Sequence, residues 1–181
     1  MSKKIKIFPN IESLNNFAAE KFVEIANESI AKRDTFSVAL AGGSTPKSLY
    51  QLLSSEKFNN KIDWSRTFFF FGDERNVLTD SDESNFRMAN ETLFKPLKIN
   101  DKNIFRWQTE LKDAEEIAKH YDEKIKHFFE ANENQPAHAG CSDRFDLILL
   151  GMGADGHTAS LFPFTEAVRT AAICRNCREL F

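Results

Sequence analysis

A histidine that follows three glycines is the residue in this sequence with the clearest capacity for chemistry. His157 lies in GMGADGHTASLFP, residues 151–163, directly after the apolar run FDLILL. An imidazole takes up and releases a proton near neutral pH, so a positioned histidine is a suitable general base. Asp155 is close enough in sequence to orient the ring, and Gly153 and Gly156 permit the backbone to approach a ligand closely. We predict that His157 and Asp155 are catalytic and that the two glycines contact substrate.

A second glycine-containing loop has the features of a phosphate site. In ALAGGSTPKSLY, Gly42 and Gly43 end an apolar run, and Ser44 and Thr45 supply hydroxyl groups before a predicted helix. The unpaired N–H groups and the dipole at the start of a helix attract anions. The loop lacks the Gly-Lys-Ser/Thr ending of a Walker loop. We predict that these four residues bind substrate, and the alternative is an ordinary strand-to-helix turn with a good cap.

Charged residues at the end of a third apolar run include a candidate cation. In FFFFGDERNV, Asp73 and Arg75 follow a run of phenylalanines, where a charge has to be solvated, paired or functional. Arg75 can bind a phosphate or carboxylate through two hydrogen bonds, and Asp73 can orient Arg75, a histidine or a substrate hydroxyl. Arg87, in SNFRMANETL, is a possible second cation. The alternatives are a strand-end ion pair for the first two and a solvated helical arginine for Arg87.

Several other kinds of catalytic or metal site are not indicated. No G-x-S-x-G is present, so an acyl-enzyme is not expected. No H-x-x-x-H or paired-carboxylate pattern indicates a metal site, and we expect neither metal nor cofactor. Cys174 and Cys177 form a C-x-x-C that supplies only half a zinc site, and with Cys141 they make an odd count that does not indicate a disulfide framework. The remaining histidines are interpreted as surface residues: His120, His127 and His138.

Apolar runs alternate with amphipathic segments, which is the pattern of an α/β protein. Strands are predicted at residues 5–8, 36–41, 67–71, 103–107 and 145–150. Helices are predicted after Asn10 as N-cap, at 46–53 with Thr45 as cap, from Ser84 to about Lys95, and after a capping box of Asp113 and Glu116. A surface loop is predicted at 133–143. Strands that are apolar throughout indicate a parallel sheet covered on both faces, and ligands of such sheets bind beyond the carboxyl ends of the strands.

The composition is that of an ordinary globular protein and excludes some classes of partner. With 181 residues, 41% apolar, the chain is expected to form one domain. The net charge of −3 offers no basic field for nucleic acid. No apolar run approaches the roughly 18 residues of a membrane span, and the start does not resemble a secretory signal. We therefore expect a cytoplasmic protein, most simply a monomer, whose partner is a small molecule.

Four segments together resemble the 6-phosphogluconolactonase family. They are ALAGGSTPKSLYQLL, FFFFGDERNV, SNFRMANETL and FDLILLGMGADGHTASLFP, in the family's order across residues 36–164. The first is shared with a wider superfamily that includes glucosamine-6-phosphate deaminase. Deaminases usually have GHIAFNEP where this chain has GHTASLFP, and DEY where it has DER. Both differences favour the lactonases.

The resemblance implies a Rossmann-like, three-layer α/β/α sandwich with a mainly parallel sheet and no cofactor or metal. It also implies hydrolysis of a phosphosugar lactone, 6-phospho-D-glucono-1,5-lactone, with His157 as the base that activates water. Two alternatives stay open at this point. One is deamination and isomerisation of an amino sugar phosphate, and the other is phosphosugar binding without catalysis.

The last residues depart from the family's pattern. The resemblance fades soon after Thr165, and the segment that follows is rich in cysteine and arginine. We expect a lactonase-like α/β domain at residues 1–165 and a divergent tail at 166–181. The fold is therefore expected to be incomplete at the C-terminus of the chain.

Overall fold

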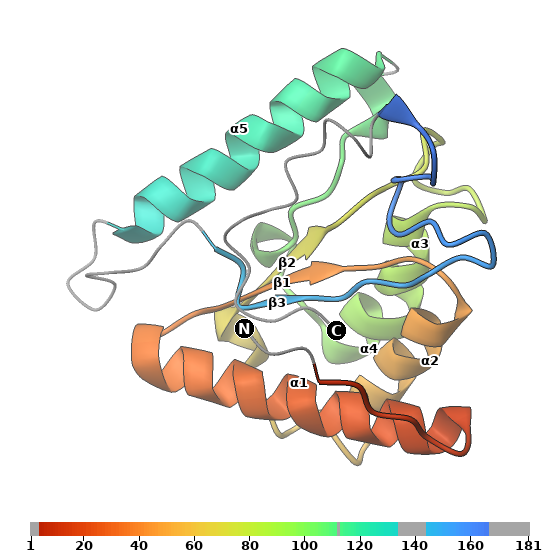
Figure 1. The fold of residues 1–181 in the computed structure, drawn as a ribbon. Helices are drawn as coiled ribbons and strands as arrows, with labels where there is room; N and C mark the ends of the chain where they lie inside the picture. Colours follow the sequence, from red (N-terminus) through yellow and green to blue (C-terminus); the bar gives the residue numbers. More distant parts are fainter. Residues whose placement is uncertain (1–3, 112, 134–143, 167–181) are drawn as a thin grey trace.

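A short parallel sheet lies between two layers of helices in the computed structural model, which describes residues 4–111, 113–133 and 144–166 (Figure 1). The strands are β1 (Phe36–Leu40), β2 (Thr67–Phe71) and β3 (Leu147–Ile148), in the spatial order β2-β1-β3. Both pairings are parallel. The helices α1 (Ile11–Arg33) and α2 (Ser44–Leu53) cover one face, and α5 (Ala114–Glu133) covers the other. The predicted α/β class and parallel sheet are confirmed.

Alternation of side chains along the strands produces two separate apolar cores. Successive residues of a strand point to opposite faces of the sheet. On β2, Phe69 and Phe71 pack with α1 and α2, whereas Phe70 packs with Phe128 and Phe129 of α5. Fully burying one such side chain contributes roughly 1.5–3 kcal/mol. A strand that is apolar at every position is therefore stable only with helices on both faces.

Two helices begin at the predicted caps. Asn10 caps α1 as predicted, since its side chain accepts a hydrogen bond from the N–H of Ser13 at 2.8 Å. Asp113 accepts one from the N–H of Glu116 at 2.8 Å, which confirms a cap at the start of α5. Ile11, the first residue of α1, is apolar but 52% exposed, so it does not belong to the buried face of the helix.

Two predicted strands are absent from the structure. Residues 5–8 form no strand, and Ile5 and Ile7 are almost fully exposed. Residues 103–107 begin in a 3₁₀ turn, η3 (Asp101–Asn103), and make a single bridge between Ile104 and Phe69. The predicted strand at 145–150 is reduced to β3. Apolar composition made these segments resemble strands, but a strand also needs a neighbour in register along its length.

Two predicted helix boundaries were also wrong. α2 begins at Ser44, before Pro46, so Thr45 lies inside the helix instead of capping it. After α3 (Asn85–Ala89), a π-helical turn, η2 (Asn90–Phe94), leads into α4 (Lys95–Leu97), so Pro96 does not stop the helical segment. Pro96 is tolerated because it lies in the first turn of α4, where its missing N–H needs no partner. Of the predicted loop at 133–143 the structure describes only Glu133, which is the last residue of α5, and of the predicted tail at 166–181 it describes only Glu166. The remaining residues of both segments lie outside the described ranges.

Two buried tyrosines complete the hydrogen bonding where the strands end. The hydroxyl of Tyr50 accepts from the N–H of Ala41 at 3.0 Å and donates to the carbonyl of the same residue at 2.8 Å. The hydroxyl of Tyr121 does the same for Phe71, at 2.8 and 3.0 Å. Burial raises the pKa of both phenols, so each hydroxyl keeps the proton that it donates. The strands can therefore stop and their loops diverge without leaving buried backbone groups unpaired.

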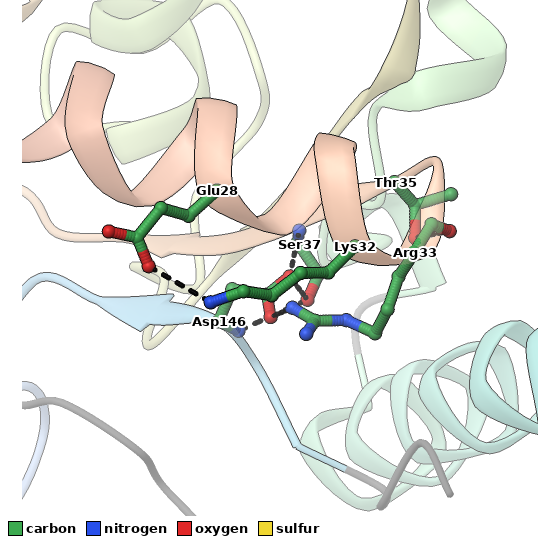
Figure 2. Close-up of polar contacts among 6 residues, drawn as sticks. All are labelled: Glu28, Lys32, Arg33, Thr35, Ser37 and Asp146. Atoms are coloured by element: carbon green, nitrogen blue, oxygen red, sulfur yellow. Dashed lines mark hydrogen bonds and ion pairs between the residues drawn. The ribbon is translucent and has the colours of Figure 1, made fainter. Parts of the chain in front are cut away.

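Asp146 anchors the start of β3 to β1 and α1 (Figure 2). Its Oδ2 accepts from the N–H and the hydroxyl of Ser37, at 2.9 and 3.1 Å, and its Oδ1 forms an ion pair with Arg33. Burial is the strongest influence on this carboxyl and raises its pKa above the ordinary value. The ionised group is therefore costly to bury, and these donors offset the cost.

Replacing Asp146 with alanine should destabilise the fold. The change leaves the buried N–H of Ser37 without its acceptor and Arg33, only 15% exposed, without its partner. We expect the free energy of unfolding, measured by chemical denaturation, to fall by about 2–4 kcal/mol. The matched control is Asp122→Ala, which breaks the exposed Asp122–Lys126 pair on α5 and should cost under about 0.5 kcal/mol. Equal losses in the two variants would contradict the role given to Asp146.

Candidate active site

Three loops leave the sheet at one edge, because the strands are parallel and their carboxyl ends point the same way (Figure 1). Residues 41–43 follow β1 and lead into α2. Residues 72–75 follow β2, and residues 149–163 follow β3 and include His157. These are the loops in which the sequence predicted the site.

Direct contacts join the three loops. Asn85, at the start of α3, donates from Nδ2 to the carbonyl of Asp73 at 3.1 Å. The same side chain fills the space beside Gly42, where an added Cβ would lie 1.9 Å from Asn85 Oδ1. Ser160 donates from Oγ to Asp73 Oδ2 at 2.9 Å. The structure thus brings Gly42, Asp73 and the His157 loop into one assembly.

The His157 ring is oriented by Asp155, two residues before it. His157 Nδ1 lies 2.5 Å from Asp155 Oδ1, and the same oxygen accepts from the backbone N–H of His157 at 3.2 Å. The hydrogen bond with His157 is the main cause of a lowered pKa at Asp155, so the carboxyl is ionised at neutral pH and can only accept. In a neutral imidazole the proton then lies on Nδ1, and Nε2 has a free lone pair. That is the tautomer a general base requires.

A glycine and an aromatic ring define the place of the imidazole. A Cβ on Gly153 would lie 2.2 Å from His157 Cε1 and 2.3 Å from Nδ1, so only glycine fits beside the ring. Gly156 has a φ of 86°, a left-handed conformation that favours glycine. Phe162 stacks on the imidazole with ring centroids 4.7 Å apart. The two predicted glycines shape the loop, and Gly153 makes room for the ring.

The start of α2 has no side-chain cap. Its N-cap is Gly43, with a φ of 104°, and no side chain caps the helix. The N–H groups of Ser44 and Thr45 are in the first turn, where no carbonyl of the helix can reach them, and the first turn contains no acidic residue. Both residues are exposed. An anion can therefore bind to backbone N–H groups that protein side chains leave uncovered.

The two candidate arginines have different surroundings. Arg87 forms ion pairs with Glu91 and Asp82, at 3.0 and 2.7 Å. Arg75 is exposed and donates to the carbonyl of Glu83 over 3.4 Å, and within the described ranges no carboxylate pairs with it. A phosphate can approach Arg75 without competing against a carboxylate, whereas Arg87 is already neutralised.

Two residues that position the site were not selected from the sequence. Asn85 and Ser160 each donate a hydrogen bond to Asp73. They lie in the two motifs from which Arg87 and His157 were predicted as site residues. Glu74 was also not among the predicted site residues. Its carboxylate accepts from the N–H groups of Asn85 and Phe86, at 2.7 and 2.8 Å, and so caps α3. Glu74 lies 11 positions before Asn85, so no local sequence signal predicted this contact.

Comparison with known proteins decides the family. The family model for glucosamine-6-phosphate isomerases and 6-phosphogluconolactonases matches residues 9–178. The chain belongs to this family. The match extends beyond the motif-bearing region at 36–164 on both sides. Among the described residues, no helix could span a membrane, and no group of three or more His, Cys, Asp or Glu side chains is arranged to hold a metal.

Several relatives of the chain are named as 6-phosphogluconolactonases. The 6-phosphogluconolactonase of Synechocystis is 36% identical over 168 residues, which cover 93% of this chain and 66% of the relative. The solved 6-phosphogluconolactonase of Trypanosoma brucei has a TM-score of 0.76 at 34% identity, and the match covers 93% of this chain and 66% of that one. The solved 6-phosphogluconolactonase of Thermotoga maritima has a TM-score of 0.68 at 37% identity, and the match covers 81% of this chain and 59% of that one. The chain thus spans about half to two-thirds of the length of the curated relatives it matches.

In this family member, Gly153→Ala should displace the imidazole without unfolding the protein. The new methyl group would overlap His157, a side chain that can rotate, and rotation breaks the bond to Asp155. We expect the NMR resonance of the His157 Cε1 proton to shift, while the free energy of unfolding changes by less than about 1 kcal/mol. Gly151→Ala is the matched control in the same loop, because nothing lies within 4 Å of its added Cβ. An unmoved resonance in Gly153→Ala would contradict this account.

Proposed function

We propose that the chain carries the catalytic base and part of the phosphate site for hydrolysis of 6-phospho-D-glucono-1,5-lactone. The observation that carries this proposal is the His157–Asp155 pair, held at the same sheet edge as an uncapped helix start. The naming of its relatives as 6-phosphogluconolactonases supports it. So does the chemistry, because a δ-lactone is a reactive ester that needs only an oriented water and a base.

The proposed reaction uses one histidine twice. His157 Nε2 removes a proton from water as the water oxygen bonds to the lactone C1, and the carbonyl oxygen becomes an oxyanion. Backbone N–H groups of the glycine-containing loops are suited to stabilise that oxyanion. The oxyanion then collapses, the bond between C1 and the ring oxygen breaks, and the imidazolium returns its proton to the ring oxygen. The product is 6-phosphogluconate, and Asp155 stabilises the imidazolium between the two transfers.

The phosphate is proposed to bind at the start of α2, with Arg75 as the candidate cation. Helix N–H groups and an arginine are both strong partners of phosphate oxygens. Glycines at 42 and 43 allow the phosphate to approach the backbone. Arg87 is the weaker candidate, since Glu91 and Asp82 already pair with it.

The base is tested by His157→Ala. We expect kcat for the lactone to fall by about 10²–10⁴, because the water loses its proton acceptor. Spontaneous hydrolysis of the lactone has to be subtracted at each concentration. His127→Ala, an exposed histidine on α5, is the control and should retain the wild-type rate. Full activity in His157→Ala would refute its role as the base. Release of ammonia from glucosamine 6-phosphate by the unaltered chain would favour the deaminase alternative.

The phosphate site is tested by Arg75→Ala. A lost charged hydrogen bond should raise KM by about 10- to 100-fold and change kcat less. Arg66→Ala, an exposed arginine at the other end of β2, is the control and should leave KM unchanged. The assignment fails if Arg87→Ala raises KM more than Arg75→Ala does.

A further inference from the structure

The loop that carries His157 depends on a serine for its contact with the loop after β2. Ser160 Oγ donates to Asp73 Oδ2 at 2.9 Å, although the two residues are 87 positions apart. The bonds that shape the loop itself are short-range. The N–H of Gly153 donates to the carbonyl of His157 at 2.8 Å, and that of Gly156 donates to Gly153 at 2.9 Å. Such internal bonds set the loop's shape but not its place relative to the other two loops.

Asp73, the acceptor of the serine hydroxyl, is itself held by a buried amide. Asn85 is 3% exposed, and its Nδ2 donates to the Asp73 carbonyl at 3.1 Å and reaches Asp73 Oδ1 at 3.4 Å. The other side of Asn85 lies against Gly42. Gly42, Asn85, Asp73 and Ser160 therefore form a continuous chain of contacts from the predicted phosphate loop to the histidine loop.

A tight turn couples Ser160 to His157. Thr158 and Leu161 exchange backbone hydrogen bonds, at 3.3 and 2.9 Å, and enclose Ala159 and Ser160. Ala159 has a φ of 49°, a conformation that residues with a Cβ rarely adopt, so the two hydrogen bonds around it must hold the turn in this shape. A displacement of Ser160 is therefore passed to His157, which directly precedes this turn.

We propose that Ser160 is a positioning residue, which acts through Asp73 and Asn85 to hold His157 at a fixed place relative to the turn at 42–45. This inference rests on the proposed lactonase function. Misplacing a catalytic group by about 1 Å can lower a rate roughly 100-fold. The phosphate would bind on other loops, so loss of the Ser160 bond should reduce kcat and leave substrate binding almost intact.

The experiment compares three variants of the full chain in the lactone assay. Ser160→Ala removes the hydroxyl, and Ser160→Thr retains it on an exposed side chain. Ser65→Ala is the control, since it removes a bond of the same chemistry, Ser65 Oγ to Asp63 Oδ1 at 2.5 Å, at the opposite end of β2. We expect Ser160→Ala to lower kcat by about 10- to 100-fold with KM changed less than about threefold. Ser160→Thr should recover most of the rate, and Ser65→Ala should lose none.

A double-mutant cycle with Asp73→Ala separates positioning from direct participation. If Ser160 acts through Asp73, adding Ser160→Ala to Asp73→Ala lowers kcat no further. Independent, multiplying losses would overturn the proposal. So would an unchanged kcat in Ser160→Ala, or a loss that appears in KM alone.

A spectroscopic readout distinguishes this proposal from the proposed function. The NMR resonance of the His157 Cε1 proton should shift or broaden in Ser160→Ala, return in Ser160→Thr and stay unchanged in Ser65→Ala. If the unaltered chain does not hydrolyse the lactone, the lactonase function fails, and the resonance still decides the positioning role. An unperturbed resonance in Ser160→Ala would refute that role even in an active protein.

Discussion

The buried carboxylate of Asp146 is the constraint on which the arrangement of the candidate site depends. β3 pairs with β1 over only two residues, so the contacts of Asp146 at its start form a large part of its attachment to β1. An ionised carboxylate can be buried only where donors surround it, and Ser37 and Arg33 supply these from β1 and α1. Those donors meet at one place, so they determine where β3 begins. The loop that follows β3 then starts at a defined point of the sheet edge.

At the carboxyl ends of the strands the three loops diverge. The backbone N–H and carbonyl groups there therefore need hydrogen-bond partners from outside the sheet. Tyr50 and Tyr121 meet this need by binding both the N–H and the carbonyl of one residue at a strand end: Ala41, which follows β1, and Phe71, the last residue of β2. Each tyrosine comes from a helix on a different face of the sheet, α2 for the first and α5 for the second. The helices that bury the sheet therefore also determine where its strands stop.

Charges at the candidate site are divided between groups that are already paired and groups that remain open to a substrate. Asp155 is hydrogen-bonded to His157, and Glu74 is hydrogen-bonded to backbone N–H groups at the start of α3. The start of α2 and Arg75 have no such carboxylate among the described residues. The proposed substrate is an anionic ester that suits this division. Its phosphate would bind the N–H groups of α2 and the guanidinium of Arg75, and its reactive carbon would lie near His157, whose tautomer is set by Asp155.

Local sequence determined much of this protein. The apolar runs that became β1 and β2, the caps at Asn10 and Asp113, and the placement of His157 just past a strand could all be predicted, because each depends on residues within one turn or one strand. The segments at 5–8 and 103–107 could not, because their apolar composition does not say whether a neighbouring strand lies beside them. The tertiary structure alone decided that Ser160 reaches Asp73 and that Asn85 fills the space beside Gly42. Contacts between residues so distant in sequence follow from strand order and register, which arise when both faces of the sheet are packed together.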